Sequence, residues 1–366
     1  TKNSMIKYYS TKNIDKKDAV YNVIFGERSN GKTYALLKKG IEQYFKDGSQ
    51  MAYVRRWKED ITGRRAQRLF EGLNVNKEIE KLSKGLYTGV YYYAGKFYLC
   101  NYNEKNKAIY SDADIIAFTF SLSDGEHDKS TSFPLVKTII FDEFLSNRTY
   151  LNDEFILFMN TISTIVRRRE DVKIYMLGNT VNKYCPYFVE MGLTNVQSME
   201  QGNIDVYNYG SSSLTVAVEY CKNADSKLNP KSNKYFAFDN PKLKMITGGA
   251  WELNIYPHLP TKYKPKDVIF NFFIEFSDNI FQCDVVIMDK IHFIYIHLKT
   301  TPIKEYTDLV YCLDYNANPY YNRSLYKPVN STQKKLAWFF HHDKVFYQNN
   351  DVGDAINNYL KIAKGV

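Results

Sequence analysis

Short apolar runs alternate with longer segments of helical periodicity between residues 20 and 180. Apolar runs of strand length lie at residues 20–25, 51–55, 115–120, 136–141 and 172–177. Residues 32–46 and 153–168 repeat their apolar positions at helical spacing, and Asn152 stands in the position of a cap for the second helix. Strands that alternate with helices are typical of a mostly parallel sheet. The pattern therefore predicts an α/β domain with helices on both faces of a parallel sheet.

The pattern changes after residue 193. Residues 223–234 are polar and rich in Asn, Lys and Ser, which is typical of a linker or an exposed loop. Three β-rich runs, separated by short polar turns, predict an antiparallel meander at residues 268–276, 281–288 and 292–298. Residues 351–364 predict a closing helix. We expect an α/β domain at residues 1–195, a linker region at 196–234 and a smaller α+β domain at 235–366.

The charge balance indicates the class of partner. The 366 residues include 49 Lys and Arg against 40 Asp and Glu, a net charge of +9 that favours a polyanionic partner. The five cysteines are scattered without a CxxC pair, which indicates free thiols in a reducing compartment. No apolar run approaches the roughly 20 residues that span a bilayer, and the N-terminus lacks the apolar core of a secretory signal. We expect a cytosolic protein with no membrane partner and, from the spacing of its histidines, no zinc site.

One motif predicts phosphate binding. A full G-x-x-x-x-G-K-[ST] pattern follows the first apolar run and opens the first helix, and it consists of Gly26, Glu27, Arg28, Ser29, Asn30, Gly31, Lys32 and Thr33. The glycines let the backbone N–H groups wrap a phosphate, and the helix N-terminus adds its positive end. Lys32 is expected to reach the β- and γ-phosphates of ATP, and the Thr33 hydroxyl to bind Mg²⁺.

Adjacent carboxylates end a later buried strand. Asp142 and Glu143 follow residues 138–141, four residues of expected buried strand, which places them at the carboxyl edge of the sheet, beside the phosphate loop. Asp142 suits a ligand of Mg²⁺, and Glu143 suits the base that orients and deprotonates the attacking water. Residues 174–180 form another strand that ends in polar residues. If it lies beside the strand of Asp142, Asn179 or Thr180 can contact the γ-phosphate or the water.

Two basic runs have open interpretations. Arg167, Arg168 and Arg169 end the second helix, where they either complement the helix dipole or supply an arginine finger to a neighbouring subunit. Lys129 is a weaker candidate for the same trans-acting role. The densest positive cluster spans residues 55–68, and its candidates for gripping nucleic-acid phosphates are Arg56, Arg64, Arg65 and Arg68. A solvated helix face is the alternative for that cluster.

The order of these elements resembles one family of motors. The segments GERSNGKT, IIFDEF, TISTIVRRRE and IYMLGNT resemble an additional-strand, catalytic-glutamate P-loop motor. More narrowly, the chain resembles the genome-packaging ATPases of small tailed bacteriophages, of the phi-twenty-nine type, which are related to the large terminases. The resemblance covers roughly the first 195 residues. In that family a smaller C-terminal domain has a vestigial ribonuclease H-like fold, and the predicted meander fits this description.

The resemblance implies the partners. It implies a homo-oligomeric ring, commonly of five subunits, that docks on the portal of an empty capsid in the host cytoplasm and drives double-stranded DNA inward. It also implies a structural packaging RNA in some members. An active nuclease of this fold needs several converging carboxylates, and the meander offers only Glu275 and Asp284 in its strands, so we expect no nuclease activity. Within the C-terminal domain, nucleic-acid or capsid docking is the expected role.

Two other functions compete with DNA translocation by an ATP-hydrolysing motor. One is a P-loop helicase or assembly ATPase that acts on another polymer. The other is a DNA-binding scaffold that uses nucleotide without hydrolysing it, and the presence of Glu143 argues against it. Stimulation of ATP turnover by double-stranded or by single-stranded DNA separates the first two functions.

Overall fold

The computed structural model describes residues 8–28, 31–124, 130–146, 150–180, 184–222, 256–259 and 262–366. The chain divides into two compact units, which are described separately. Unit 1 comprises Thr1–Asn147 and Asp153–Glu252, and unit 2 comprises Arg148–Asn152 and Leu253–Val366. No helix in the described part of the chain is long and apolar enough to cross a membrane. The predicted linker at residues 223–234 lies outside the described residues, so the position of the domain boundary stays a prediction.

Unit 1 is built on a mixed sheet. Its strands, in order across the sheet, are β3 (Gly89–Tyr93), β4 (Lys96–Tyr102), β6 (Ile115–Ser121), β2 (Gln50–Arg55), β7 (Val136–Asp142), β8 (Lys173–Asn179), β1 (Tyr21–Gly26), β10 (Thr215–Tyr220) and β9 (Ile204–Asn208), and β5 (Ala108–Ile109) pairs with β4. Neighbours from β6 to β10 are parallel, whereas β3, β4 and β9 are antiparallel additions. The parallel sheet that the sequence predicts is confirmed.

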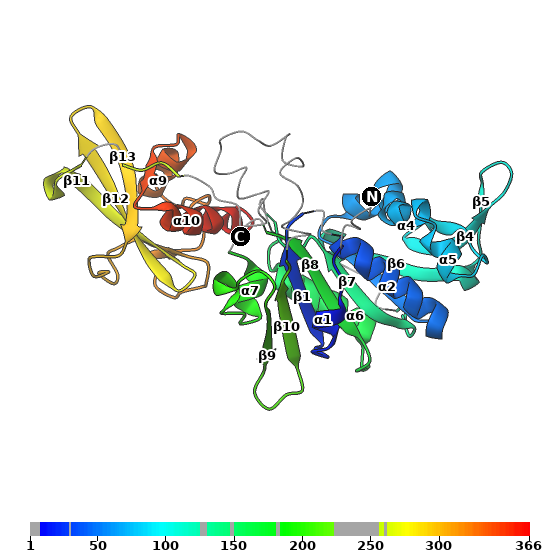
Figure 1. Ribbon diagram of the computed structural model, residues 1–366. Helices are drawn as coiled ribbons and strands as arrows, with labels where there is room; N and C mark the ends of the chain where they lie inside the picture. The colour runs from blue at the N-terminus through cyan, green and yellow to red at the C-terminus, as the bar shows by residue number, and fades with distance from the viewer. Residues whose placement is uncertain are drawn as a thin grey trace, which may run out of the picture. The chain divides into compact units, whose positions relative to one another are not determined.

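Helices cover both faces of this sheet (Figure 1). The described helices of unit 1 are α1 (Lys12–Asp15), α2 (Lys32–Asp47), α3 (Gly63–Gln67), α4 (Glu71–Val75), α5 (Glu78–Leu82), α6 (Glu154–Val166) and α7 (Pro186–Glu190), with short 3-10 turns at Lys58–Ile61, Arg68–Phe70, Asp112–Asp114, Leu122–Asp124 and Val196–Ser198. Strand side chains alternate between the faces. Ile140 packs in the core beneath α2, whereas the ring of Phe141 lies 4.7 Å from that of Phe158 on α6.

Two expectations from the sequence are wrong. Residues 204–220, expected within a linker region, form β9 and β10 and extend the sheet next to β1. The pairing partner of β10 lies almost two hundred residues earlier, so no local pattern reports it. Asn152 does not cap α6, because the cap position falls on Asp153, whose backbone is left-handed and whose side chain makes no capping bond.

Unit 2 contains a second mixed sheet in the order β15 (Tyr321–Asn322), β14 (Val310–Cys312), β11 (Val268–Phe276), β12 (Asn279–Met288), β13 (Ile291–Leu298) and β16 (Val345–Tyr347). The predicted meander of β11, β12 and β13 is antiparallel, as expected. It is only the middle of the sheet, because β14, β15 and β16 add in parallel. Helices α9 (Ser331–His341) and α10 (Asn350–Ala363) and a 3-10 turn at Pro265–Asp267 are the other helical elements among the described residues of this unit.

Candidate nucleotide-binding site

The loop between β1 and α2 lies at the carboxyl edge of the parallel sheet. Gly31 occupies the cap position of α2 with φ at 85°, a left-handed conformation that glycine adopts without steric cost. A Cβ atom there would also lie 3.3 Å from the side chain of Tyr8, which packs against the loop. The first backbone N–H groups of α2 therefore face the loop without intrahelical partners, as an anion site requires. Ser29 and Asn30 of the motif lie outside the described residues.

Thr33 and Asp142 meet although 109 positions separate them. The Thr33 hydroxyl donates a hydrogen bond of 2.9 Å to Oδ2 of Asp142. The buried hydroxyl of Tyr53 on β2 donates to the same oxygen at 2.8 Å, and burial together with the charge of Asp142 raises the pKa of Tyr53. A hydroxyl and a carboxylate side by side provide the hard oxygen ligands that Mg²⁺ prefers. The pair predicted to bind magnesium is thus brought together.

Glu143 directly follows β7 in a left-handed conformation, with φ at 57°. Its backbone N–H donates to Oδ1 of Asp142 at 3.0 Å, and its carboxylate forms an ion pair of 2.7 Å with Arg55 at the end of β2. Arg55 also lies 3.3 Å from Asp60. The predicted base is therefore next to the predicted magnesium ligand, and a guanidinium holds its carboxylate.

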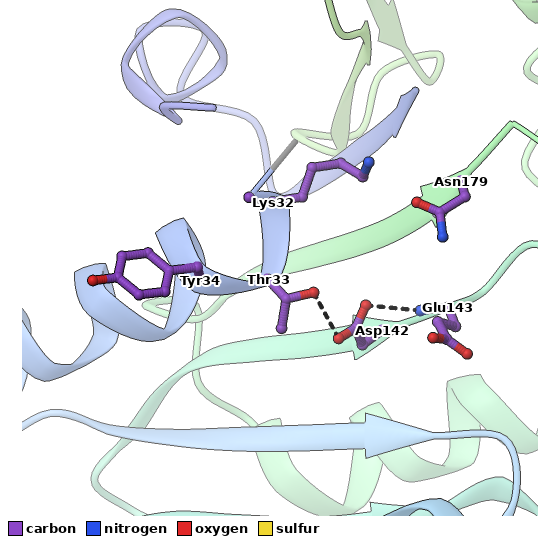
Figure 2. A pocket seen from close by; sticks show the side chains of 8 residues that line it. Lys32, Thr33, Tyr34, Asp142, Glu143 and Asn179 are labelled. Carbon is purple, nitrogen blue, oxygen red and sulfur yellow. Dashed lines mark hydrogen bonds between the residues drawn. The ribbon is translucent and has the colours of Figure 1, made fainter. Parts of the chain in front are cut away.

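A pocket of about 210 Å³ unites these residues. Its lining consists of Gly31, Lys32, Thr33, Tyr34, Asp142, Glu143, Gly178 and Asn179. Figure 2 shows Thr33, Asp142, Glu143 and Asn179 around one opening, whereas the ring of Tyr34 points away from them. Asn179 reaches this place because β8 lies between β1 and β7. Thr180, its predicted alternative, is bonded instead to the phosphate loop, through a backbone N–H that donates to the Gly26 carbonyl at 2.8 Å.

The ammonium of Lys32 lies within the loop. It donates to the carbonyl of Glu27 at 2.7 Å, and the residue is only 6% exposed. Burial lowers the pKa of Lys32, while the nearby Cys221, Asp142 and Glu27 oppose this shift. Burial also raises the pKa of Glu27, against the effect of Lys32. A phosphate in the pocket would supply the charge that this buried ammonium favours.

The three arginines after α6 have different surroundings. Arg169 donates to the carbonyls of Phe133, Pro134, Val136 and Ile165, so its guanidinium is bound within its own subunit. Arg167 is exposed and donates to the carbonyl of Thr131 at 2.8 Å, and Arg168 is exposed. The run precedes β8, at the amino edge of the parallel strands, whereas the pocket lies at their carboxyl edge. No arginine of this run lines the pocket of its own chain.

The arginines predicted to contact DNA differ in their exposure to solvent. Arg64, Arg65 and Arg68 are exposed, with Arg65 paired to Asp60 at 2.9 Å. The structure contradicts the expectation for Arg56, which is 5% exposed and is paired with Glu154 in the interior. Its position directly after β2, beneath the turn that follows β7, explains the burial. Lys129 lies outside the described residues, so its role stays a prediction.

Sequence reasoning missed Tyr53 and assigned Arg55 and Arg56 only to a basic cluster with a candidate role in gripping DNA. Tyr53 contacts Asp142, Arg55 contacts Glu143, and Arg56 contacts the backbone after Asp142. The available signal was that residues 51–55 form a strand of the same parallel sheet, whose end reaches the edge that carries Asp142. Which strand lies next to β7 is decided by tertiary pairing, so the partners could not be named from the sequence.

The comparison with known families bears on this site. Residues 3–226 match the model of the podovirus DNA encapsidation protein (Gp16), which is more than half of the chain. The chain belongs to the podovirus DNA encapsidation protein family. The matched part of the chain contains Lys32, Thr33, Asp142, Glu143 and Asn179.

Individual relatives agree with this family. The chain is 31% identical over 179 residues to the DNA packaging protein of Bacillus phage B103, across 48% of this chain and 49% of the relative. It is 28% identical over 189 residues to the DNA packaging protein of Bacillus phage phi29, across 51% of this chain and 50% of the relative. The matched region thus spans about half the length of these curated relatives.

Solved structures resemble the whole chain in fold. The Phi-28 gp11 DNA packaging motor matches with a TM-score of 0.55 at 17% identity, over 98% of this chain and 99% of the other. The bacteriophage Phi-29 viral genome packaging motor assembly matches with a TM-score of 0.54 at 21% identity, over 97% and 99% of the two chains. At these identities the likeness is one of fold.

Proposed function

We propose that this member of the encapsidation family is an ATP-hydrolysing motor that moves double-stranded viral DNA into a preformed capsid. One observation carries the ATPase part: Thr33, Asp142, Glu143 and Asn179 come from separate elements to line one pocket with Lys32. The relatives named as DNA packaging proteins support the choice of DNA as the polymer. A helicase, another assembly ATPase and a non-hydrolytic scaffold remain as outcomes of the test.

The residues divide the work of hydrolysis. Backbone N–H groups at the start of α2 and the ammonium of Lys32 bind and orient the phosphates of ATP. Thr33 and Asp142 would hold Mg²⁺, which neutralises phosphate charge when bound. Glu143 accepts a proton from the attacking water, and its position directly after Asp142 keeps that water beside the terminal phosphate. Asn179 orients the water or the γ-phosphate from β8.

The fold supports a finer classification. The insertion of β8 between β1 and β7 is what we would expect of the additional-strand, catalytic-glutamate class of P-loop ATPases. In unit 2, the mixed sheet with α9 and α10 supports a ribonuclease H-like fold. Asp284 is bonded to His297, Tyr263 and Gln282, so it is engaged by protein groups. This engagement favours a domain without nuclease activity that docks on nucleic acid or the capsid.

The motor works as an assembly of identical subunits. The arginine run lies away from the pocket of its own chain, which supports a role for Arg167 or Arg168 as the finger of a neighbouring subunit in a homo-oligomeric ring. The family resemblance suggests five members for this ring. Lys129 is the weaker trans-acting candidate. The portal of the capsid, double-stranded DNA and, in some members, a packaging RNA are the further partners, and the place of action is the portal vertex in the host cytoplasm.

The test compares the wild type with Glu143→Gln. We expect the variant to bind Mg-ATP with unchanged affinity and to lose turnover by about a hundredfold or more, because the water lacks its base. Double-stranded DNA should raise the ATP turnover of the wild type. When the wild type is mixed with empty capsids, ATP and DNA, the packaged DNA should become resistant to added nuclease. Stimulation by single-stranded DNA alone would favour a helicase. Native turnover in the variant would remove Glu143 from the mechanism.

A further inference from the structure

A charged cluster is buried behind the nucleotide pocket. Arg56 lies 2.5 and 3.0 Å from the two carboxylate oxygens of Glu154 at the start of α6. Tyr187 on α7 donates to the same carboxylate at 2.6 Å. Arg56, Glu154 and Tyr187 are 5%, 3% and 0% exposed. A buried ion pair carries a large desolvation cost, so pairing alone gives the fold little reason to hold these charges here.

The remaining donors of Arg56 reach the turn that carries Glu143. One terminal nitrogen donates to the Phe144 carbonyl at 2.7 Å, and the other donates to the Glu143 carbonyl at 3.2 Å. The same turn is held from β8, because the Phe144 N–H donates to the Leu177 carbonyl at 3.1 Å. At Gly178, a Cβ atom would lie 2.9 Å from Phe144 and from Leu145, so β8 and the turn are in close contact.

Glu143 needs such support. Its φ of 57° is a left-handed conformation that a residue other than glycine adopts at a cost of about 1 kcal/mol or more. Two carbonyl bonds from a single rigid guanidinium oppose relaxation of the turn to a more ordinary conformation. Adjacent residues at the end of β2 thus contact different parts of this turn: Arg55 pairs with the exposed carboxylate of Glu143, whereas Arg56 holds its backbone.

We propose that Arg56 is a positioning residue for hydrolysis, which sets the backbone of Glu143 while Glu154 and Tyr187 fix the guanidinium. This inference rests on the proposed role of Glu143 as the base. Arg56 is not among the residues that line the nucleotide pocket. A displacement of the Glu143 carboxylate by about 1 Å is enough to lower the rate of hydrolysis by up to a hundredfold without removing a group that binds nucleotide.

The test uses Arg56→Lys in the full chain. A lysine retains the positive charge beside Glu154, but its single nitrogen cannot reproduce the guanidinium fork that contacts two carbonyls and a carboxylate. We expect kcat to fall at least tenfold, with KM and Mg-ATP affinity within twofold of the wild type. Arg323→Lys is the matched control, because Arg323 in unit 2 also donates to a backbone carbonyl, that of Leu313 at 2.6 Å.

A double-mutant cycle separates positioning from general damage. If Arg56 acts through the Glu143 carboxylate, Arg56→Lys should not lower the residual turnover of Glu143→Gln any further. A merely structural role predicts losses that multiply in the double variant. Three results would each overturn the proposal. They are an unchanged kcat in Arg56→Lys, a rise in KM as large as the fall in kcat, and losses of turnover that multiply in the double variant.

A second variant tests the positioning role if Arg56→Lys does not fold. The combination Arg56→Met, Glu154→Leu and Tyr187→Phe replaces the cluster by apolar side chains, a change that buried ion pairs often tolerate. It should fold, bind Mg-ATP and show the same loss of kcat. If this variant has the wild-type kcat, or if neither it nor Arg56→Lys folds, the cluster contributes to stability alone. If Glu143→Gln itself retains native turnover, the proposed function fails first; if that variant is inactive while Arg56→Lys is native, only the positioning role fails.

Discussion

The guanidinium of Arg55 lies 2.7 Å from the carboxylate of Glu143, the residue proposed as the base of ATP hydrolysis. The two residues end neighbouring strands, since Val54 of β2 is in register with Phe141 of β7. The Glu143 side chain is 58% exposed, so the pair contributes at most about 1 kcal/mol. An interaction this weak costs little to break, so the Glu143 carboxylate can exchange Arg55 for another partner.

Replacement of Arg55 should therefore release the base. We predict that Arg55→Gln raises ATP turnover in the absence of DNA about two- to fivefold and reduces the further stimulation by double-stranded DNA, as measured by phosphate release. Lys173→Gln is the control, because it removes another exposed ion pair of unit 1, to Asp18 at 2.8 Å. A fall in both basal and stimulated turnover would instead give Arg55 a part in the hydrolytic step.

The arginine run should divide into one structural residue and a finger. Arg169→Ala removes four hydrogen bonds to carbonyls, and we predict a lower melting temperature. Arg167→Ala or Arg168→Ala should retain the native melting temperature, with one of them losing turnover. Mixing that inactive variant with Lys32→Ala should restore some hydrolysis, because mixed rings contain interfaces with both elements intact. No recovery in confirmed mixed rings would favour a role within the subunit.

DNA contacts by the exposed arginines should appear in the salt dependence. Each phosphate contact releases counterions, so the triple replacement of Arg64, Arg65 and Arg68 by Ala should flatten the logarithmic salt slope of double-stranded DNA binding by about one to three units. Arg65, already paired with Asp60, should contribute least. Replacing the exposed Lys77, Lys81 and Lys84 removes the same charge elsewhere on unit 1 and serves as the control. Equal slopes for both triple variants would place the DNA grip on another surface.

The stability of unit 2 should depend on pH through His297. Its Nε2 faces Asp284 Oδ2 at 2.9 Å and its Nδ1 faces the Leu298 carbonyl at 2.7 Å, so the imidazolium form satisfies both acceptors. Burial by itself lowers the pKa of His297, but the bond to Asp284 and its charge outweigh burial and raise it. Tyr263 also donates to Asp284, and the ring of Tyr295 stacks on His297.

The sign of the effect follows from these shifts. Because the pKa of His297 is raised in the folded protein, the charged imidazolium stabilises the fold. This contribution is complete when the pH is below the ordinary histidine pKa of about 6.5, and it is lost as the pH rises through the raised pKa. Despite the opposing effect of burial, hydrogen bonds lower the pKa of Asp284, and that contribution is lost only in acid, below about 3.8. We predict that His297→Gln costs about 1–3 kcal/mol near pH 6 and less at pH 9, in unfolding titrations. The exposed His341→Gln is the control, and a pH-independent difference would contradict the charged pair.

The local elements of this protein could be predicted from its sequence because their signals are local. The apolar runs at residues 20–25 and 136–141 became β1 and β7, and the glycine-rich loop between β1 and α2 has the expected position. A strand that ends in two carboxylates places them at the carboxyl edge of any parallel sheet, so the meeting of Thr33 with Asp142 followed from pattern and topology together.

The tertiary structure decided the partners, since each of them is distant along the chain. Glu154 lies 98 positions from Arg56, and their pairing turned an expected surface cation into a buried one that supports the Glu143 turn. Arg55 and Arg56 are neighbours of the same type, and only the order of strands places one beside a carboxylate and the other beneath a backbone turn.

The short strands of unit 2 also depend on tertiary structure. Strands β14 and β16 are three residues long, too short for a periodic signal, and form only because β11 and β13 offer free edges. Long-range pairing and burial, which have no local signature, thus determined how the motif residues are held.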